Sequence, residues 1–233
     1  MMRQLMSFLL LAAVPAICQE SGDRKQALQQ RIVEVKQSIA QNQAQLQKYS
    51  WVETTEISLK GEIKKRDQKD CSYGPDGEIR KVPVSAPAPA KHQRGLKGRI
   101  IENKVDDMKE YMDRVGSLIH RYVPPDPQAM QAAFQSGKAA LQPAGSSGPG
   151  SLVFRDYAKQ GDTVTFTFDA TTRTLRSFRV DTYLDAPQDV VRLDASFSSL
   201  SDGTNFLEQT VLDAQAKSIR VKTTNFGHRK AGS

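Results

Sequence analysis

Between residues 152 and 226 the chain alternates apolar and polar residues in short runs, and turn-forming residues separate the runs. In the clearest run, 163–169, Val164, Phe166 and Phe168 share one face and threonines occupy the other. This is the pattern of a half-buried β-strand. The same alternation predicts strands at 177–184, 190–197 and 218–226, and a further strand at 205–213 has apolar residues on both faces. Because the links are short, neighbouring strands are expected to form an antiparallel meander, with Leu175 out of phase at a bulge.

Three more strands are predicted before this meander. The β-branched run 49–60 alternates with period two, which is typical of a strand. Segments 62–73 and 78–84 form the two arms of a hairpin closed by Gly74-Pro75-Asp76-Gly77. The first arm is basic, with Lys64, Lys65, Arg66 and Lys69. These cations either protect a sheet edge from pairing or form a basic docking face.

Helical spacing of apolar residues predicts three helices. The first, 23–48, has a narrow apolar stripe that includes Asn42, which either pairs with another buried amide or lies at a wet edge. The third starts at Asp126-Pro127, a capping residue followed by a first-turn proline, and extends to Leu141 with Met130 and Phe134 on its apolar side.

The second helix, 98–122, carries the most regular stripe. Its apolar residues recur at alternating spacings of four and three: Ile101, Val105, Met108, Met112, Val115, Ile119 and Tyr122. Such a stripe serves either a helix that lies on a sheet or a coiled coil, and we favour the first. The predicted fold is therefore α+β: a curved antiparallel sheet, or open half-barrel, covered by two or three helices. We expect a single domain over 19–233 with a helical insertion at about 98–142.

The N-terminus predicts export. Arg3 is followed by an apolar run over 5–17, which is long enough for a signal peptide and too short to span a bilayer. We assign residues 1–18 to the signal peptide, with cleavage after Ala16 or Cys18 and a lipidated Cys18 as the alternative. The expected location is periplasmic or secreted. The formal net charge of +7 suits an anionic membrane surface as a contact, whereas export and the lack of a recognisable motif argue against nucleic acid.

The sequence contains no catalytic or metal-binding motif that we recognise. None of the three histidines, His92, His120 and His228, has a second histidine or a cysteine at the spacing of a zinc site. The carboxylates of the meander lie at turns or on its polar face. Cys71 is expected to be a passive strand residue. We therefore predict a protein without enzymatic activity, metal or cofactor.

The apolar face of the sheet is the candidate binding surface. Either the helices fill it completely, or it leaves a cavity for an apolar ligand. The residues expected to line such a cavity are Ile57, Leu59, Met108, Met112, Val164, Phe166, Phe168, Phe178, Val180, Val191, Leu193 and Phe197.

Two segments carry a resemblance to known proteins. Leu200-Ser201-Asp202-Gly203-Thr204-Asn205-Phe206 and Leu212-Asp213-Ala214-Gln215-Ala216-Lys217-Ser218-Ile219 resemble a family of secreted bacterial proteins of unassigned function. The order of signal peptide, helix, Tyr49-Ser50-Trp51 strand, helical insertion and meander resembles the LolA, LolB and RseB type of lipoprotein carrier. That resemblance implies an open half-barrel that binds acyl chains. The hairpin and the segment 85–99 depart from the carrier pattern.

Together these observations predict an exported, non-enzymatic binding protein, monomeric, that holds an acyl chain, a lipoprotein or another apolar ligand. An alternative is a protein–protein interaction module that uses the heptad-patterned helices. A cell-wall hydrolase with a carboxylate pair is a third hypothesis.

Overall fold

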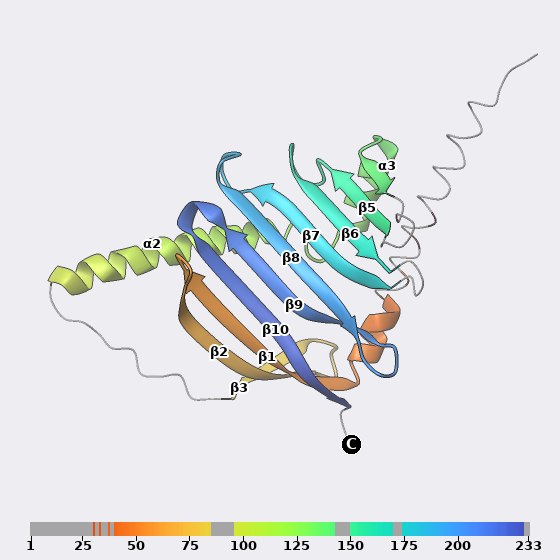
Figure 1. Cartoon of the computed structure of the whole chain (residues 1–233), viewed down its shortest axis with the longest axis horizontal. Helices are drawn as coiled ribbons and strands as arrows, with labels where there is room; N and C mark the ends of the chain where they lie inside the picture. The colour runs from red at the N-terminus through yellow and green to blue at the C-terminus, as the bar shows by residue number, and fades with distance from the viewer. Residues whose placement is uncertain are drawn as a thin grey trace, which may run out of the picture. The chain divides into compact units, whose positions relative to one another are not determined.

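The computed structural model is built around one ten-stranded antiparallel sheet (Figure 1). It describes residues 40–84, 96–142, 150–169 and 174–230 with positions 30, 33 and 37, and side chains of the long helix from residue 105 on. The strands are β1 (Tyr49–Leu59), β2 (Glu62–Tyr73), β3 (Ile79–Pro83), β4 (Ala139–Gln142), β5 (Gly150–Arg155), β6 (Thr163–Phe168), β7 (Leu175–Tyr183), β8 (Val190–Ser199), β9 (Asn205–Ala214) and β10 (Ile219–Lys230). The helices are α2 (Leu96–Ile119) and α3 (Pro127–Gln135), with a 3-10 turn at Gln215–Lys217. Residues 40–46 are also helical.

The strand order explains how the sheet is assembled. It runs β3-β2-β1-β10-β9-β8-β7-β6-β5-β4, so the first three strands build outward to one edge. The segment with α2 and α3 leads to β4 at the opposite edge, from which the meander returns until β10 pairs with β1. The sheet stays open, with β3 and β4 as its edges. The predicted α+β class and antiparallel meander are confirmed.

The observed strands match the predicted ones closely, and the predicted bulge near Leu175 is present. Thr167 pairs with Ser177 while Phe168 pairs with Leu175, so Arg176 is the extra residue. An extra residue of this kind shifts the phase of the strand, which is why Leu175 falls on the buried face despite its spacing.

The third helix is shorter than predicted, and the placement of Leu141 in it was wrong. Asp126 caps the helix as expected, accepting a hydrogen bond from the Gln128 N–H at 2.8 Å. Gly137 has a φ of 72°, and the N–H of Lys138 donates to Ala133 at 2.8 Å, which closes the helix in a Schellman motif. The following residues, with Leu141, form edge strand β4 instead.

The packing face of α2 also differs from the predicted stripe. The helix ends at Ile119, before the predicted end at 122. Val115 in α2 and Tyr122 in the turn after it are buried as expected, but the other buried residues of α2 are Tyr111 and Leu118. Val105 is 59% exposed, and Met108, Met112 and Ile119 are only partly buried. The apolar stripe and the packing face overlap only in part, because two aromatic hydroxyls find partners on the sheet side. The Tyr111 hydroxyl donates to Asp189 at 2.7 Å and that of Tyr122 to Asp162 at 2.7 Å.

Helices α2 and α3 cover one part of one sheet face, which we call the inner face. In Figure 1 both lie behind the sheet, α3 beside β5. Rings of the inner face pack edge to face or tilted, with Phe154–Phe166 centroids 6.0 Å apart and Phe166–Phe178 centroids 5.0 Å apart. We call β5 and β6, with β7 from Phe178 onward and β8 up to Ala195, the covered half.

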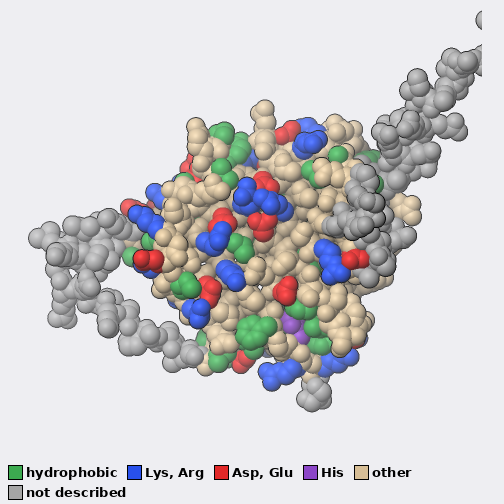
Figure 2. Space-filling view, in the orientation of Figure 1, with side chains coloured by type: hydrophobic (Ala, Val, Ile, Leu, Met, Phe, Trp, Pro, Cys, Tyr) green, Lys and Arg blue, Asp and Glu red, His purple; other side chains and the backbone are tan. Residues whose placement is uncertain are grey.

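The opposite, outer face is polar, and its charges alternate across strands. In one row, Asp181 pairs with Arg192, Arg192 with Asp213, and Asp213 with Arg220. Arg192 Nε lies 2.6 Å from Asp181, and Arg220 Nε lies 2.7 Å from Asp213. Figure 2 shows side chains of both signs gathered in the middle of this face. Opposite charges directly across from each other favour one register over a slipped one.

The basic arm of the first hairpin forms part of an edge. Strand β3 pairs with β2 only over Lys69–Tyr73, so among the described residues the first half of β2 has a free edge. Its cations are ion-paired: Lys64 with Glu62, Lys65 with Asp67 and Arg66 with Glu56. A charged edge of this kind matches the edge-protection interpretation.

Several predictions concern segments outside the described residues. These are the signal peptide 1–18, most of the first helix before residue 40, the segment 85–95, the linker 143–149, the turn 170–173 and the side chain of Ile101. Within the described part of the chain, no helix combines the length and apolar character needed to cross a membrane.

Candidate ligand-binding cleft

Half of the predicted ligand-lining residues are packed core. Val164, Val180 and Val191 are fully inaccessible, and Phe166, Phe178 and Leu193 are at most 8% exposed. Ile57, Leu59, Phe168, Met108 and Met112 are partly buried. A binding role for all of these residues stays a prediction. Phe197, also predicted, lines a cleft elsewhere on the sheet.

That cleft has two chambers, which lie over β1, β2, β3, β9 and β10 and reach Leu175 and Phe197 at the adjoining ends of β7 and β8. We call this region the cleft half. Its first chamber has a volume of about 380 Å³. Its walls are mostly apolar, with amide groups from residues 40–46 and β9. They are formed by Asn42, Gln43, Leu46, Tyr73, Gly77, Ile79, Leu175, Phe197, Asn205 and Leu207. We call this space the apolar chamber.

A short hydrogen-bond chain holds the helical wall of the apolar chamber in place. The Asn42 side-chain oxygen accepts a hydrogen bond from the Asn205 N–H at 3.0 Å. The Asn205 side chain donates in turn to the Leu175 carbonyl at 2.8 Å. Asn42 therefore binds strand backbone, not a second buried amide. This hydrogen bond holds the helical segment in a position where Leu46 lies over the sheet and lines the cleft.

A second, smaller chamber of about 230 Å³ shares Leu46, Tyr73, Ile79 and Leu207 with the first. Its remaining walls combine aromatic rings with polar side chains: Trp51, Glu53, Lys81, Phe206, Asn225 and His228. We call it the aromatic chamber.

Four rings form a row across this chamber, one from each of β2, β1, β10 and β9. Tyr73 and Trp51 have centroids 5.5 Å apart, Trp51 and His228 are 5.9 Å apart, and His228 and Phe206 are 4.1 Å apart. The strand order brings these rings together from positions 73, 51, 228 and 206. We call them the aromatic row.

Hydrogen bonds fix the centre of the row. The Trp51 indole N–H donates to the Asn225 side chain at 3.1 Å, and Asn225 donates to the Leu207 carbonyl at 2.9 Å. Trp51 is only 8% exposed. The row is therefore a preorganised wall, whose other members Tyr73, Phe206 and His228 are less buried than Trp51.

The charges of the aromatic chamber balance. Lys81 Nζ lies 2.5 Å from a Glu53 carboxylate oxygen, which neutralises both. Burial lowers the pKa of His228, which favours a neutral imidazole, and burial raises the pKa of Tyr73. Opposite Trp51 on the neighbouring strand, Cys71 is buried, and that burial raises the pKa of its thiol, as is typical of an unreactive cysteine.

Sequence reasoning missed most of the aromatic row. Strand β10 was expected to end at residue 226, which left His228 in a tail, whereas the strand continues to Lys230. Tyr73 was read as one end of a hairpin arm, and Phe206 belonged to a strand without a clear apolar face. The face shared by Trp51 and Glu53 was visible as alternation, but the pairing of its strand with β10 was not.

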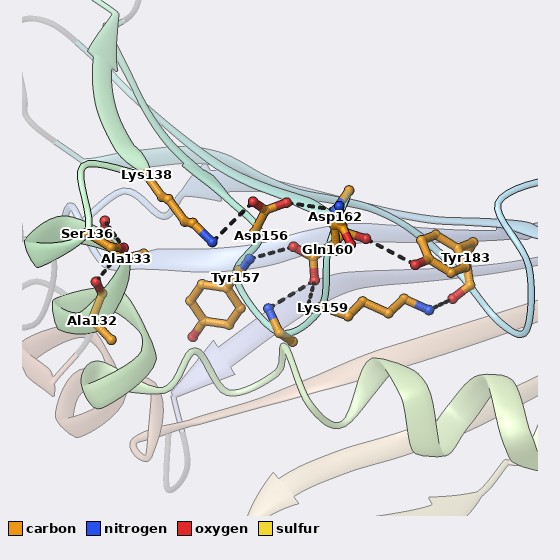
Figure 3. Close-up of polar contacts among 12 residues, drawn as sticks. Ala132, Ala133, Ser136, Lys138, Asp156, Tyr157, Lys159, Gln160, Asp162 and Tyr183 are labelled. Carbon is orange, nitrogen blue, oxygen red and sulfur yellow. Dashed lines mark hydrogen bonds and ion pairs between the residues drawn. The ribbon is translucent and has the colours of Figure 1, made fainter.

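A second polar cluster, around Asp162, is part of the core (Figure 3). Asp162 is 1% exposed and accepts hydrogen bonds from the Tyr122 hydroxyl and from the N–H groups of Tyr157, Ala158 and Lys159. Four hydrogen bonds thus reach this carboxylate, which offsets the free-energy cost of burying it. The arrangement joins the end of α2 to the loop between β5 and β6.

Within the described residues, no group of three or more His, Cys, Asp or Glu side chains is placed to hold a metal ion.

The chain was compared with protein families, curated proteins and solved structures. No protein-family model matches the chain, and no curated protein matches it. A crystal structure of a DUF1329 family protein from Desulfovibrio piger is similar over 90% of this chain and 94% of that chain, at 11% identity and a TM-score of 0.45.

Proposed function

We propose that the protein is an exported binding protein that holds an acyl chain or a similar apolar moiety in the apolar chamber. The observation that carries this proposal is the contrast within the inner face, which is closed over the covered half and open to an apolar-lined cleft over the cleft half. The volume of about 380 Å³ lies within the range of small-molecule sites, about 300–1,000 Å³.

The lining of the apolar chamber suits an acyl chain better than a compact polar ligand. Leu46, Ile79 and Leu207 contribute aliphatic surface from three separate segments, and Phe197 adds a ring. Burial of each methylene contributes about 0.8 kcal/mol, so even part of an acyl chain gives useful affinity. The predicted signal peptide and the resemblance to lipoprotein carriers support the same proposal.

The test is direct binding. The full chain is titrated with a fluorescent fatty acid, and lipids extracted from natively purified protein are identified by mass spectrometry. We expect saturable uptake and a co-purified apolar ligand. Phe197→Asp should lower affinity by at least tenfold, whereas Phe226→Asp, outside the cleft and 46% exposed, should not. No uptake by the folded protein would reject the proposal.

One observation favours the alternative of an interaction module. The stripe positions Val105, Met108, Met112 and Ile119 are not the packing face of α2 and stay exposed or partly buried. A partner helix could use this stripe. Light scattering tests a self-association version, which predicts a dimer that Met108→Glu converts to monomer; a monomer at high concentration rejects it.

A further inference from the structure

The aromatic chamber differs in chemistry from the apolar chamber beside it. An acyl chain needs no polar partner, yet this chamber presents four rings, an amide and an ion pair. Its volume of about 230 Å³ lies below the range of about 300–1,000 Å³ that is usual for whole ligands. It is therefore sized for one part of a ligand whose other part occupies the adjoining space.

Polar atoms in this chamber are left available. Among the described residues, nothing hydrogen-bonds the Tyr73 hydroxyl or the ring nitrogens of His228, and both side chains line the chamber. No buried side-chain nitrogen or oxygen lacks a partner in the described structure, so these free atoms reach accessible space. They offer a ligand both donors and acceptors.

The charges select a neutral group. Glu53 and Lys81 neutralise each other at 2.5 Å. An ionic head group would have to compete with this pair, because each charge already has its partner. An uncharged group leaves the pair intact.

We infer that the aromatic chamber binds an uncharged sugar-like ring, which lies against the aromatic row while its hydroxyls bond Tyr73 and His228. A sugar ring has apolar C–H faces that fit aromatic surface and hydroxyls around its edge, the two features that this wall offers together. The ligand of the whole cleft is then a neutral glycolipid-like amphiphile, with its chain in the apolar chamber. This inference rests on the proposed function and narrows it.

Four probes share an eight-carbon chain and differ in their head groups. Their affinities therefore separate the contribution of the head group from that of the chain. The probes are octyl glucoside, octanoate, octyltrimethylammonium and triethylene glycol monooctyl ether, which is neutral but lacks a ring. Each is titrated below its micelle concentration into the full chain. Trp51 is the only tryptophan, so its emission reports events in the aromatic chamber. We expect octyl glucoside to bind at least tenfold more tightly than the other three, as two hydrogen bonds of ordinary strength would give.

Two variants isolate the polar atoms while they keep the rings. Tyr73→Phe and His228→Phe should each weaken octyl glucoside by about three- to tenfold and leave the ringless ether unchanged. Tyr183→Phe is the matched control, since that hydroxyl binds the Gln160 carbonyl outside the cleft. Unfolding midpoints confirm that the variants are folded.

The outcomes distinguish the two proposals. Equal affinity for all four probes, a preference for an ion, or a double variant that still binds octyl glucoside normally would overturn the glycolipid inference and leave chain binding intact. If no probe and no fatty acid binds, the proposed function fails as well.

Discussion

The covered half and the cleft half of the sheet share one alternating pattern but have different interiors. In the covered half, Val164, Phe166 and Val180 are at most 1% exposed on the face of the sheet where α2 and α3 lie. In the cleft half, Tyr73 and Leu207 are only partly buried and line a cleft. Alternation along a strand therefore identifies the inner face without showing whether that face is filled.

The two halves also treat polar groups differently. The covered half satisfies its buried carboxylate completely, with Asp162 bound by a hydroxyl and backbone N–H groups. The cleft half keeps polar atoms on Tyr73 and His228 that no described residue uses. A region that closes its hydrogen bonds internally serves stability, and a region that leaves them open is available for binding.

The largest effect should come from truncating a ring in the covered half. Phe166→Ala should lower the free energy of unfolding by about 3–5 kcal/mol, because the site is enclosed and leaves a cavity. Phe197→Ala, in the cleft half, should cost much less, since its ring is already partly exposed. Urea unfolding of both variants measures the difference. Equal losses would show that the two halves are packed alike.

Next in size is the loss of the buried carboxylate. Asp162→Ala leaves the Tyr122 hydroxyl and several backbone N–H groups without their acceptor, and each unsatisfied buried group costs about 1–3 kcal/mol. We expect a loss of about 3 kcal/mol in denaturant unfolding. Asp113→Ala, exposed on α2, is the control and should change little. A mild effect of Asp162→Ala would mean that water replaces the carboxylate.

Much of the difference between the two halves could not be predicted from the sequence, because it depends on contacts between distant residues. Strands and turns follow from local patterns, so the meander, the hairpin and the bulge near Leu175 were predicted. The end of α3 depended on Gly137, whose positive φ stops the helix before Leu141. The packing face of α2 depended on distant partners, Asp189 and Asp162, which no spacing reveals.

The cleft was harder still to predict. Its row of rings arises only when β10 pairs with β1 and β9, which joins residues more than 150 positions apart. The apolar residues that looked like a ligand site are mostly those that the helices need as core. Phe197 was foreseen as a lining residue, while His228 and Phe206 were not.

A smaller difference between the two halves is expected in the pH dependence of folding stability. Burial in the cleft half lowers the pKa of His228, so below its unfolded value of about 6.5 the unfolded chain binds protons more readily than the native protein. Its contribution to stability is complete above about pH 6.5 and is lost as the pH falls through the lowered pKa. Asp202, whose pKa is lowered by its hydrogen bond from Tyr49, stays ionised throughout this window.

Urea midpoints measured from pH 7.5 to 5.5 test this dependence. The unmodified protein should lose stability over that range, and His228→Phe should lose less because the ring stays and the titration is removed. His120→Gln, at the exposed end of α2, should follow the unmodified protein. Parallel curves for His228→Phe and the unmodified protein would show that the imidazole is not desolvated in the cleft.

The smallest effect lies on the outer face, where the two halves are joined by a row of alternating charges. Arg192 stands between Asp181 and Asp213, so Arg192→Ala removes one ion pair on β8 and should cost about 0.5–1 kcal/mol. Most of this loss should vanish in 1 M salt, because exposed pairs are screened. Arg192→Glu should cost more, since it places like charges opposite each other on both sides. If Arg192→Glu is tolerated as well as Arg192→Ala, the row does not help to set the register, and the inner-face packing of the covered half alone determines how the cleft half is aligned.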